Sequence, residues 1–372
     1  MNERSFVANL GYYEFRKALL VLSSIAIIIV ISAMSPSFRD ISAAQDFLNN
    51  VSLLLILTMA LSIPFLAGLK DFSLGGWYVL ALCMIRLWRQ SSYGAEANSA
   101  YHILFALGLG LTLAIACLFQ AWLISKRAKY VVPISLAIGL LLASVAFYKM
   151  PDPGPWGDAY ACVSWMVAPK YIFLFCVFAL IVTMVQSVRY FWPELFWIRP
   201  VIAVWIASAL LIFVVYEYGG LSLGSLMAFF VIMGTYFFLH HSLWGRAIFA
   251  MGGNPEAARL CGISLTRLSM IVFAVFGALV ALAALFENRS ISNENTFIAL
   301  DRHLDAFVAL MLGGVSYRGG FGSIGSVLTG ALFVSSINLF QLHLGWSIFL
   351  LLAIKAIGII LAIVFDPAHK EV

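Results

Sequence analysis

The chain has 372 residues, of which 63% are hydrophobic and 10% are charged. A soluble domain needs far more charge on its surface, so the composition excludes an ordinary soluble enzyme. The basic residues behind the net charge of +5 are spread over loops, and we expect no nucleic-acid partner. Runs of about 20 apolar residues recur, as is typical of membrane-spanning helices. We therefore predict an all-α fold, a polytopic membrane helical bundle that contacts the lipid bilayer as one domain over residues 1–372.

The apolar blocks predict about 10–12 membrane segments. They cover residues 18–34, 51–69, 75–88, 101–124, 130–148, 166–187, 200–217, 220–241, 268–287, 304–316, 322–342 and 346–365. The first block follows Arg4, Arg16 and Lys17, which also fits a cleaved signal peptide, but its length favours an uncleaved helix. If the N-terminus is cytoplasmic, basic residues predominate on the cytoplasmic side. Both termini and residues 242–267 then lie in the cytoplasm.

Two blocks are short for a crossing. Residues 75–88 would rise about 21 Å as a helix and residues 304–316 about 20 Å, against a hydrocarbon core of about 30 Å. Each adjoins a glycine-rich break, at 68–76 and 313–325. Irregular backbone at membrane depth is tolerated only inside protein or along a watery cavity. The two blocks are therefore predicted to be short broken or re-entrant helices beside a substrate path, the alternative being plain surface loops.

Three ionisable residues in or beside apolar blocks are candidates for function, because such groups are costly in a membrane. Asp71 either faces the cavity or fixes the first break, and the alternative is a local ion pair with Lys70. Asp305 opens a short block and is expected to cap it. Lys355 lies in the last block, where it either snorkels or faces a partner subunit.

The sequence of residues 245–263 predicts a short helix. Asn254 can cap it, and Pro255 suits the first helical position because no N–H is needed there. Glu256 places negative charge in the first turn, and Gly262 can take the left-handed conformation that closes a helix. We expect a helix of about six residues between two membrane segments.

The sequence GRAIFAMGGNPEAARLCGI at 245–263 closely resembles the cytoplasmic signature loop of the membrane subunits of ribose-type, simple-sugar ABC importers. The resemblance implies that 242–267 is a coupling loop whose helix docks on a separate ATPase subunit. The residues it assigns to coupling are Arg246, Gly252, Gly253, Asn254, Pro255, Glu256, Ala257, Ala258, Arg259 and Gly262.

Both breaks also resemble segments of that family. LKDFSLGG departs from the family pattern at Lys70 and Phe72, and LDAFVALMLGGVSYRGGFGSIGS is the second match. The likeness fades over residues 130–197. By this resemblance the substrate path is formed by Asp71, Phe72, Ser73, Gly75, Gly313, Gly314, Gly319 and Gly320.

The implied function is that of a permease subunit in the bacterial inner membrane. It forms the path for a small sugar delivered by a periplasmic binding protein, together with a second permease copy or a sister permease. No phosphate-cradling G-x-x-x-x-G-K-[ST] motif occurs, so we expect no enzymatic activity and no cofactor on this chain. ATP and Mg²⁺ are expected on the partner ATPase.

Several alternatives stay open. The permease could serve branched-chain amino acids or nucleosides, because those subunits share the architecture. An ion-coupled secondary transporter usually needs several buried carboxylates or histidines, which look scarce here. A membrane enzyme needs a catalytic cluster, and we identify neither catalytic residues nor a metal site. The five cysteines lack paired spacing, and His240–His241 is interpreted as a membrane-boundary pair.

Overall fold

The apolar runs of the sequence form helices in the computed structural model, which describes residues 3–35, 38, 41–90, 99–126, 138, 166–167, 221–287 and 296–364. The N-terminal helices are α1 (Glu3–Met34), α2 (Ile41–Leu66), α3 (Leu74–Gln90) and α5 (Ser99–Lys126). The later helices are α9 (Leu223–His241), α10 (Leu243–Gly253), α11 (Pro255–Leu260), α12 (Leu265–Phe286), α13 (Thr296–Gly313), α14 (Ile324–Leu344) and α15 (Ile348–Val364). A two-residue antiparallel pair joins β1 (Met166–Val167) to β2 (Leu221–Ser222).

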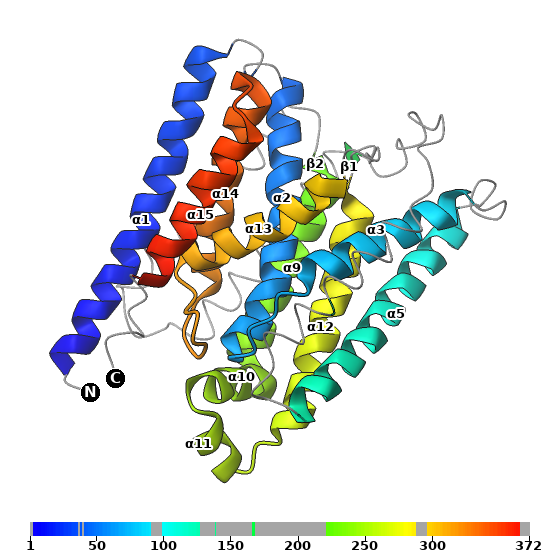
Figure 1. Cartoon of the computed structure of the whole chain (residues 1–372), viewed down its shortest axis with the longest axis vertical. Coiled ribbons are helices and arrows are strands. Elements are labelled where there is room, and N and C mark those ends of the chain that lie inside the picture. Colours follow the sequence, from blue (N-terminus) through cyan, green and yellow to red (C-terminus); the bar gives the residue numbers. More distant parts are fainter. Residues whose placement is uncertain are drawn as a thin grey trace, which may run out of the picture.

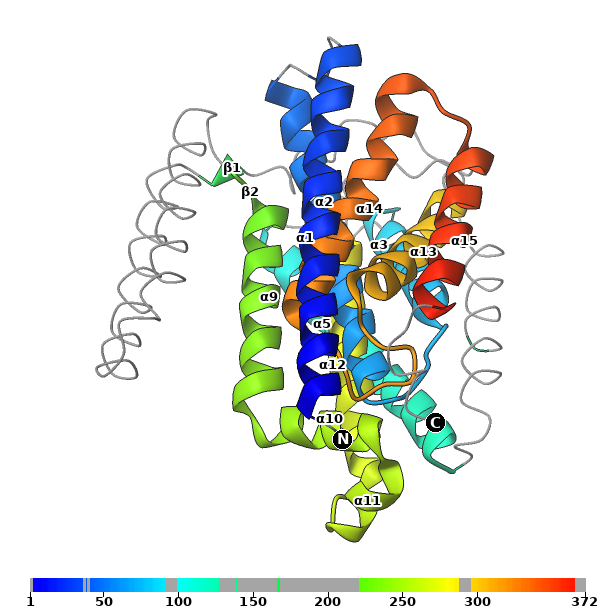
Figure 2. The same ribbon diagram turned by 90° about the vertical axis from the view of Figure 1, so that its left-hand side faces the viewer.

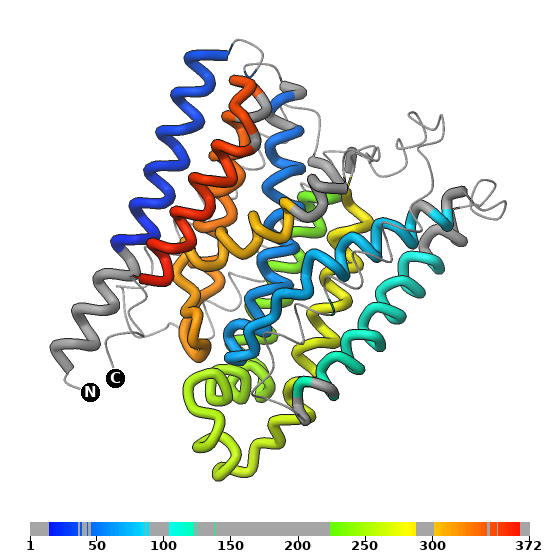
Figure 3. Tube along the Cα trace, viewed as in Figure 1, coloured from blue at the N-terminus to red at the C-terminus, as the bar shows by residue number. Residues whose placement is uncertain are grey.

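Helix α2 forms the centre of the described part of the bundle. Every residue from Val51 to Ala67 is buried, and α2 packs against α9, α12, α13 and α14 (Figures 1 and 2). Around it, α5 lies along α12 and α1 lies along α14. Gly277 permits the first of these approaches, because a Cβ there would lie 2.8 Å from the Leu113 carbonyl oxygen. The C-terminal helices therefore close around an N-terminal one, as the tube in Figure 3 shows.

Five described helices are long and apolar enough to cross a membrane. The spans are Phe15–Met34, Asp46–Leu66, Leu104–Trp122, Gly224–His241 and Leu265–Phe286. Large apolar side chains on the outer faces of α1, α5, α9 and α15 are exposed, including Leu22, Leu111, Phe237 and Ile357. Exposed apolar faces on helices of this length fit contact with lipid. The prediction of an all-α polytopic membrane bundle is confirmed.

Most predicted blocks correspond to helices, but their lengths differ. The blocks 130–148, 166–187 and 200–217 lie outside the described residues, apart from residues 138 and 166–167. The second short block is longer than predicted, because α13 begins at Thr296. An apolar run stops at charged residues, whereas the helix continues through Asp301, Arg302 and Asp305 because partners neutralise them.

The two short blocks form helices that are a few residues longer than predicted, but neither is among the five described helices long and apolar enough to cross a membrane. Helix α3 has 17 residues and α13 has 18, so they rise about 26 and 27 Å. Both lie obliquely to α1 and α2 (Figure 1). The prediction of two short helices is therefore confirmed, and each adjoins an irregular glycine-rich segment.

Candidate functional site

Helix α11 has the capped structure that its sequence predicts. The Asn254 side chain accepts a hydrogen bond from the Ala257 N–H at 3.0 Å, and Pro255 occupies the first helical position. Glu256 lies in the first turn, and Gly262 closes the helix with φ +83°. The helix projects from one end of the bundle (Figures 1 and 2). Local chemistry alone therefore fixes this element.

Much of α11 is open to a partner. Leu260 is 88% exposed, and Glu256, Ala257 and Arg259 are exposed beside it, while Ala258 is buried against the rest of the chain. An apolar side chain flanked by an acid and a base offers both a packing anchor and charge complementarity to a docking protein.

The preceding segment is a second helix that the sequence reading did not predict. Ser242 caps α10 by accepting a hydrogen bond from the Gly245 N–H at 3.0 Å. Gly245, Ile248 and Met251 form its buried face, whereas Arg246 is exposed. The signal was the apolar spacing of these three residues, which is helical. The predicted loop 242–267 is therefore two helices followed by a turn.

Helix α10 ends against both glycine-rich breaks. A Cβ on Gly252 would lie 1.9 Å from the Leu66 carbonyl oxygen and 2.4 Å from the Gly320 nitrogen. The Gly320 N–H donates to the same Leu66 oxygen at 2.9 Å. A Cβ on Gly319 would lie 2.5 Å from the Gly68 Cα. We call Gly68, Gly252, Gly319 and Gly320 the glycine junction, in which three distant segments touch through their backbones.

The first break is held by a buried polar cluster. Asp71 is fully buried and accepts hydrogen bonds from the Ser73 N–H at 3.0 Å, the Ser73 hydroxyl at 2.7 Å and the Gln120 amide at 3.0 Å. Gln120 also accepts from the Trp77 indole at 2.6 Å. These contacts fix the chain just before α3, whose first turn contains buried Gly75. Of the roles expected for Asp71, this geometry fits fixing the break.

Aromatic rings fill the space between the two breaks. Phe65 lies edge-on to Phe72 and to Phe307, with centroids 6.2 and 5.6 Å apart. Phe72 also contacts Phe307 at 5.3 Å. The Lys70 ammonium lies 4.3 Å from the centroid of the Tyr317 ring, a cation–π contact, and is thus directed at the second break. Lys70 and Phe72 are the two positions that depart from the family pattern. Lys70 contacts Tyr317 of the second break, and Phe72 contacts Phe65 of α2 and Phe307 of α13.

The second break is a tight loop between α13 and α14. Gly314, Gly319 and Gly320 have φ of +105°, +92° and +72°, which disfavour any residue with a Cβ. The helices cross closely beside it, because a Cβ on Gly313 would lie 2.1 Å from the Ser326 carbonyl oxygen. Arg16 of α1 donates to the Met311 carbonyl oxygen at 2.7 Å, in the last turn of α13. The same oxygen also accepts from the Gly314 N–H at 3.2 Å, so Arg16 adds a second donor at this helix end.

Comparison with known proteins identifies the family. A family model described as "Branched-chain amino acid transport system / permease component" matches residues 43–364. The chain belongs to this permease family. The permease is 37% identical over 136 residues to the ribose import permease protein of Escherichia coli strain K12, covering 37% of this chain and 42% of that protein.

Two other relatives point to the same kind of protein. The permease is 32% identical over 155 residues to the xylose transport system permease protein of E. coli K12, covering 42% of this chain and 39% of that protein. It is 35% identical over 128 residues to the ribose import permease protein of Bacillus subtilis strain 168, covering 34% and 40%. The chain therefore matches only 39% to 42% of the length of these relatives. No solved structure matches the permease significantly.

Two interpretations of single charges were wrong. Asp305 does not open a helix, because it lies inside α13, where it is buried. Lys355 of the permease neither snorkels nor faces a partner subunit. The residue is 4% exposed, and its ammonium lies 2.5 Å from an Asp305 carboxylate oxygen. The expected scarcity of buried charge is wrong as well, so family membership is the better argument against an ion-coupled carrier.

The histidine pair and three of the five cysteines lie within the described residues. His240 and His241 lie in the last turn of α9, so the boundary-pair interpretation fits. Cys83 and Cys117 are free and buried, and Cys261 is free and exposed. Cys162 and Cys176 lie outside the described residues of the permease.

Proposed function

We propose that this permease forms the translocation path of an ABC importer for a small sugar, driven by a separate ATPase that docks on α11. The observation that carries the proposal is the glycine junction, which joins the exposed α10–α11 segment to both breaks. The relatives named as ribose and xylose permeases favour a monosaccharide as the substrate.

The coupling step follows from the contacts. A displacement of α11 passes along α10 to Gly252, which meets Leu66 and Gly320 at backbone distance. Backbone atoms in contact cannot yield by changing rotamer, so the displacement reaches both breaks. The Phe65, Phe72 and Phe307 rings join the first break to α2 and α13, and Phe65 and Lys70 contact Tyr317 of the second break, so that repacking of these rings would open or close the path. This arrangement supports alternating access, with the residues of the two breaks as the path.

The proposed assembly fixes the remaining partners. Helix α11 and both termini lie in the cytoplasm of a bacterium, and the permease resides in the inner membrane. A periplasmic binding protein delivers the sugar at the opposite end of the bundle. A second permease copy or a sister permease completes the path. ATP and Mg²⁺ bind to the ATPase, and this chain holds no cofactor.

The docking role can be tested on the assembled importer. Leu260→Ser removes the 88% exposed anchor of α11 and should reduce ATPase copurification and ATP-driven ribose or xylose uptake about tenfold or more. Leu243→Ser is the matched control, because Leu243 is 74% exposed on α10, outside α11. Equal ATPase binding by both variants would refute docking through α11. Uptake of leucine in place of sugars would replace the substrate class and leave the coupling role intact.

A further inference from the structure

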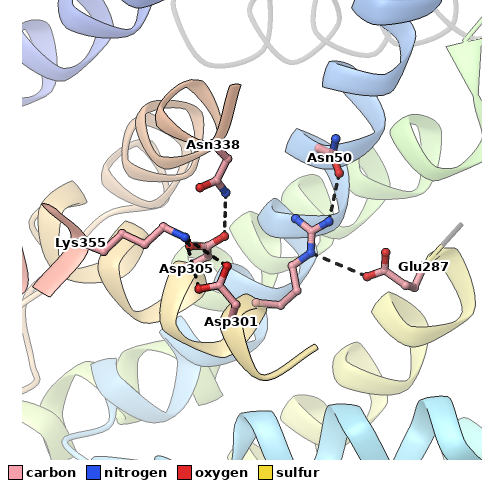
Figure 4. Close-up of polar contacts among 7 residues, drawn as sticks. Asn50, Glu287, Asp301, Asp305, Asn338 and Lys355 are labelled. Atoms are coloured by element: carbon pink, nitrogen blue, oxygen red, sulfur yellow. Dashed lines mark hydrogen bonds and ion pairs between the residues drawn. The ribbon is translucent and has the colours of Figure 1, made fainter. Parts of the chain in front are cut away.

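Helix α13 is bound on one side through Arg302. This buried guanidinium donates from Nη2 to the Asn50 side-chain oxygen of α2 at 3.0 Å. Its Nε lies 3.8 Å from a Glu287 carboxylate oxygen at the end of α12. The Tyr78 hydroxyl of α3 donates to that same oxygen at 2.5 Å. One arginine thus joins α13 to α2 and to the end of α12 (Figure 4), and Glu287 extends this contact to Tyr78 of α3.

The other side of α13 is bound through Lys355 of α15. The ammonium lies 2.5 Å from one Asp305 oxygen and 3.3 Å from the Asp301 carboxylate. The second Asp305 oxygen accepts a hydrogen bond from the Asn338 amide of α14 at 2.7 Å. Figure 4 shows these four side chains converging from three helices. Helices α13, α14 and α15 are therefore joined by short, buried contacts.

The two sides are unequal. The pair between Lys355 and Asp305 has hydrogen-bond distance and is almost fully buried, so separating it would strand two charges away from water. The pair between Arg302 and Glu287 is longer, with 3.8 Å between Nε and the carboxylate oxygen against 2.5 Å for Lys355 and Asp305. A looser contact of this kind is the one that can open when α13 moves.

The Arg302 contacts lie far from the glycine junction. Asn50 precedes Leu66 by 16 residues of α2, or about 24 Å, and Glu287 follows Leu265 by 22 residues of α12, or about 33 Å. Both therefore lie toward the end of the bundle opposite α11, whereas the C-terminal end of α13 adjoins the second break (Figure 1). Helix α13 thus runs from the Arg302 contacts to the second break.

We propose that Arg302 and Glu287 form an outer latch, closed in this structure, and that Lys355 and Asp305 hold α13, α14 and α15 together as one body. The proposal rests on the proposed transport function. When the ATPase displaces the glycine junction, this body turns about the second break. The latch separates while the Lys355 contacts persist. The path then opens on the side from which the binding protein delivers the sugar.

The test compares Glu287→Gln with Lys355→Met in the reconstituted importer with its own ATPase and binding protein. Glu287→Gln keeps the shape and the Tyr78 acceptor but removes the charge that holds Arg302. We expect the half-saturating concentration of ribose-loaded binding protein to fall about fivefold, with a melting temperature lowered less than in Lys355→Met, because the substituted side chain still accepts from Tyr78 and Arg302 keeps its bond to Asn50. Hydrogen exchange over residues 296–304 should rise by a similar factor. Lys355→Met should lower the melting temperature further, because it leaves the buried Asp305 carboxylate and the partly buried Asp301 carboxylate without their cation.

The outcomes separate the latch from the transport function. Unchanged exchange over 296–304 in Glu287→Gln, or a melting temperature lowered as far as in Lys355→Met, overturns the latch. If the double variant Arg302→Glu with Glu287→Arg has the wild-type hydrogen exchange over 296–304 and the wild-type melting temperature, the latch is supported. If the wild-type assembly imports no sugar while Glu287→Gln still raises exchange over 296–304, the transport function and the latch's role in it are overturned, and only the contact that holds α13 is supported.

Discussion

Replacing Gly252 with alanine tests the glycine junction directly. The added Cβ would lie 1.9 Å from the Leu66 carbonyl oxygen, 2.4 Å from the Gly320 nitrogen and 2.9 Å from the Gly320 Cα. These neighbours are backbone atoms, so no rotamer change relieves the overlap. To reach the 3.4 Å of an ordinary contact, α10 must shift away from Leu66.

The expected effect combines two terms. Overpacking of a closely packed site costs about 1–3 kcal/mol. Loss of the hydrogen bond from the Gly320 N–H to Leu66 adds about 1 kcal/mol, giving about 2–4 kcal/mol in all. Moving α10 away from Leu66 and Gly320 at this cost in free energy should lower ATP-driven sugar uptake at least tenfold. Copurification of the ATPase should persist, because α11 itself is unchanged.

The assay is uptake by proteoliposomes, with melting of the purified permease measured alongside. Gly253→Ala is the control for stability, because its Cβ would meet nothing within 4 Å. Gly234→Ala on α9, also with nothing within 4 Å, is the control for uptake. If Gly252→Ala melts and transports like these controls, the junction does not join α10 to the breaks.

Three further substitutions probe separate contacts. Gly330→Ala places a Cβ 1.9 Å from the Ala309 carbonyl oxygen, so the crossing of α13 and α14 should lose about 1–3 kcal/mol, measured by the melting temperature of the permease. Asn254→Ala removes the cap of α11 and should lower the helix stability by about 1 kcal/mol, measured as weaker copurification of the ATPase; Asn254→Asp should retain it. Arg16→Met removes one of the two donors to the Met311 carbonyl oxygen, leaving the Gly314 N–H, and should raise hydrogen exchange at the second break; unchanged exchange there would show that the contact is dispensable.

How much the sequence predicts depends on the range of the interaction. The cap, first turn and end of α11 depend on residues within about eight positions, and all three were predicted correctly. The breaks were located because glycine runs interrupt apolar blocks. The start of α13 was missed because its three charged residues end the apolar run, and only their distant partners keep the helix in the bundle.

Long-range contacts could not be read from the sequence. Gly68, Gly252 and Gly320 were assigned to separate features, and nothing local shows that their backbones touch. The same holds for Lys355, whose partners lie on another helix, 50 and 54 residues earlier in the chain (355 − 305 and 355 − 301). The shared signal was the abundance of glycine in all three segments, because close approach of backbones requires it.

The two ends of α2 connect the glycine junction to the outer latch. Leu66, at its C-terminal end, accepts the Gly320 hydrogen bond, and Asn50, near its N-terminal end, accepts from Arg302. Every residue between Val51 and Leu66 is buried, and a helix packed on all sides moves as a rigid element. A push on Leu66 therefore passes toward Asn50, about 24 Å away, across Pro64, where the helix lacks one backbone hydrogen bond. Helix α13 likewise adjoins the glycine junction at its C-terminal end and is bound through Arg302. The ATPase side and the side of the binding protein are therefore connected through both α2 and α13, and weakening one contact should change the coupling between them without abolishing it.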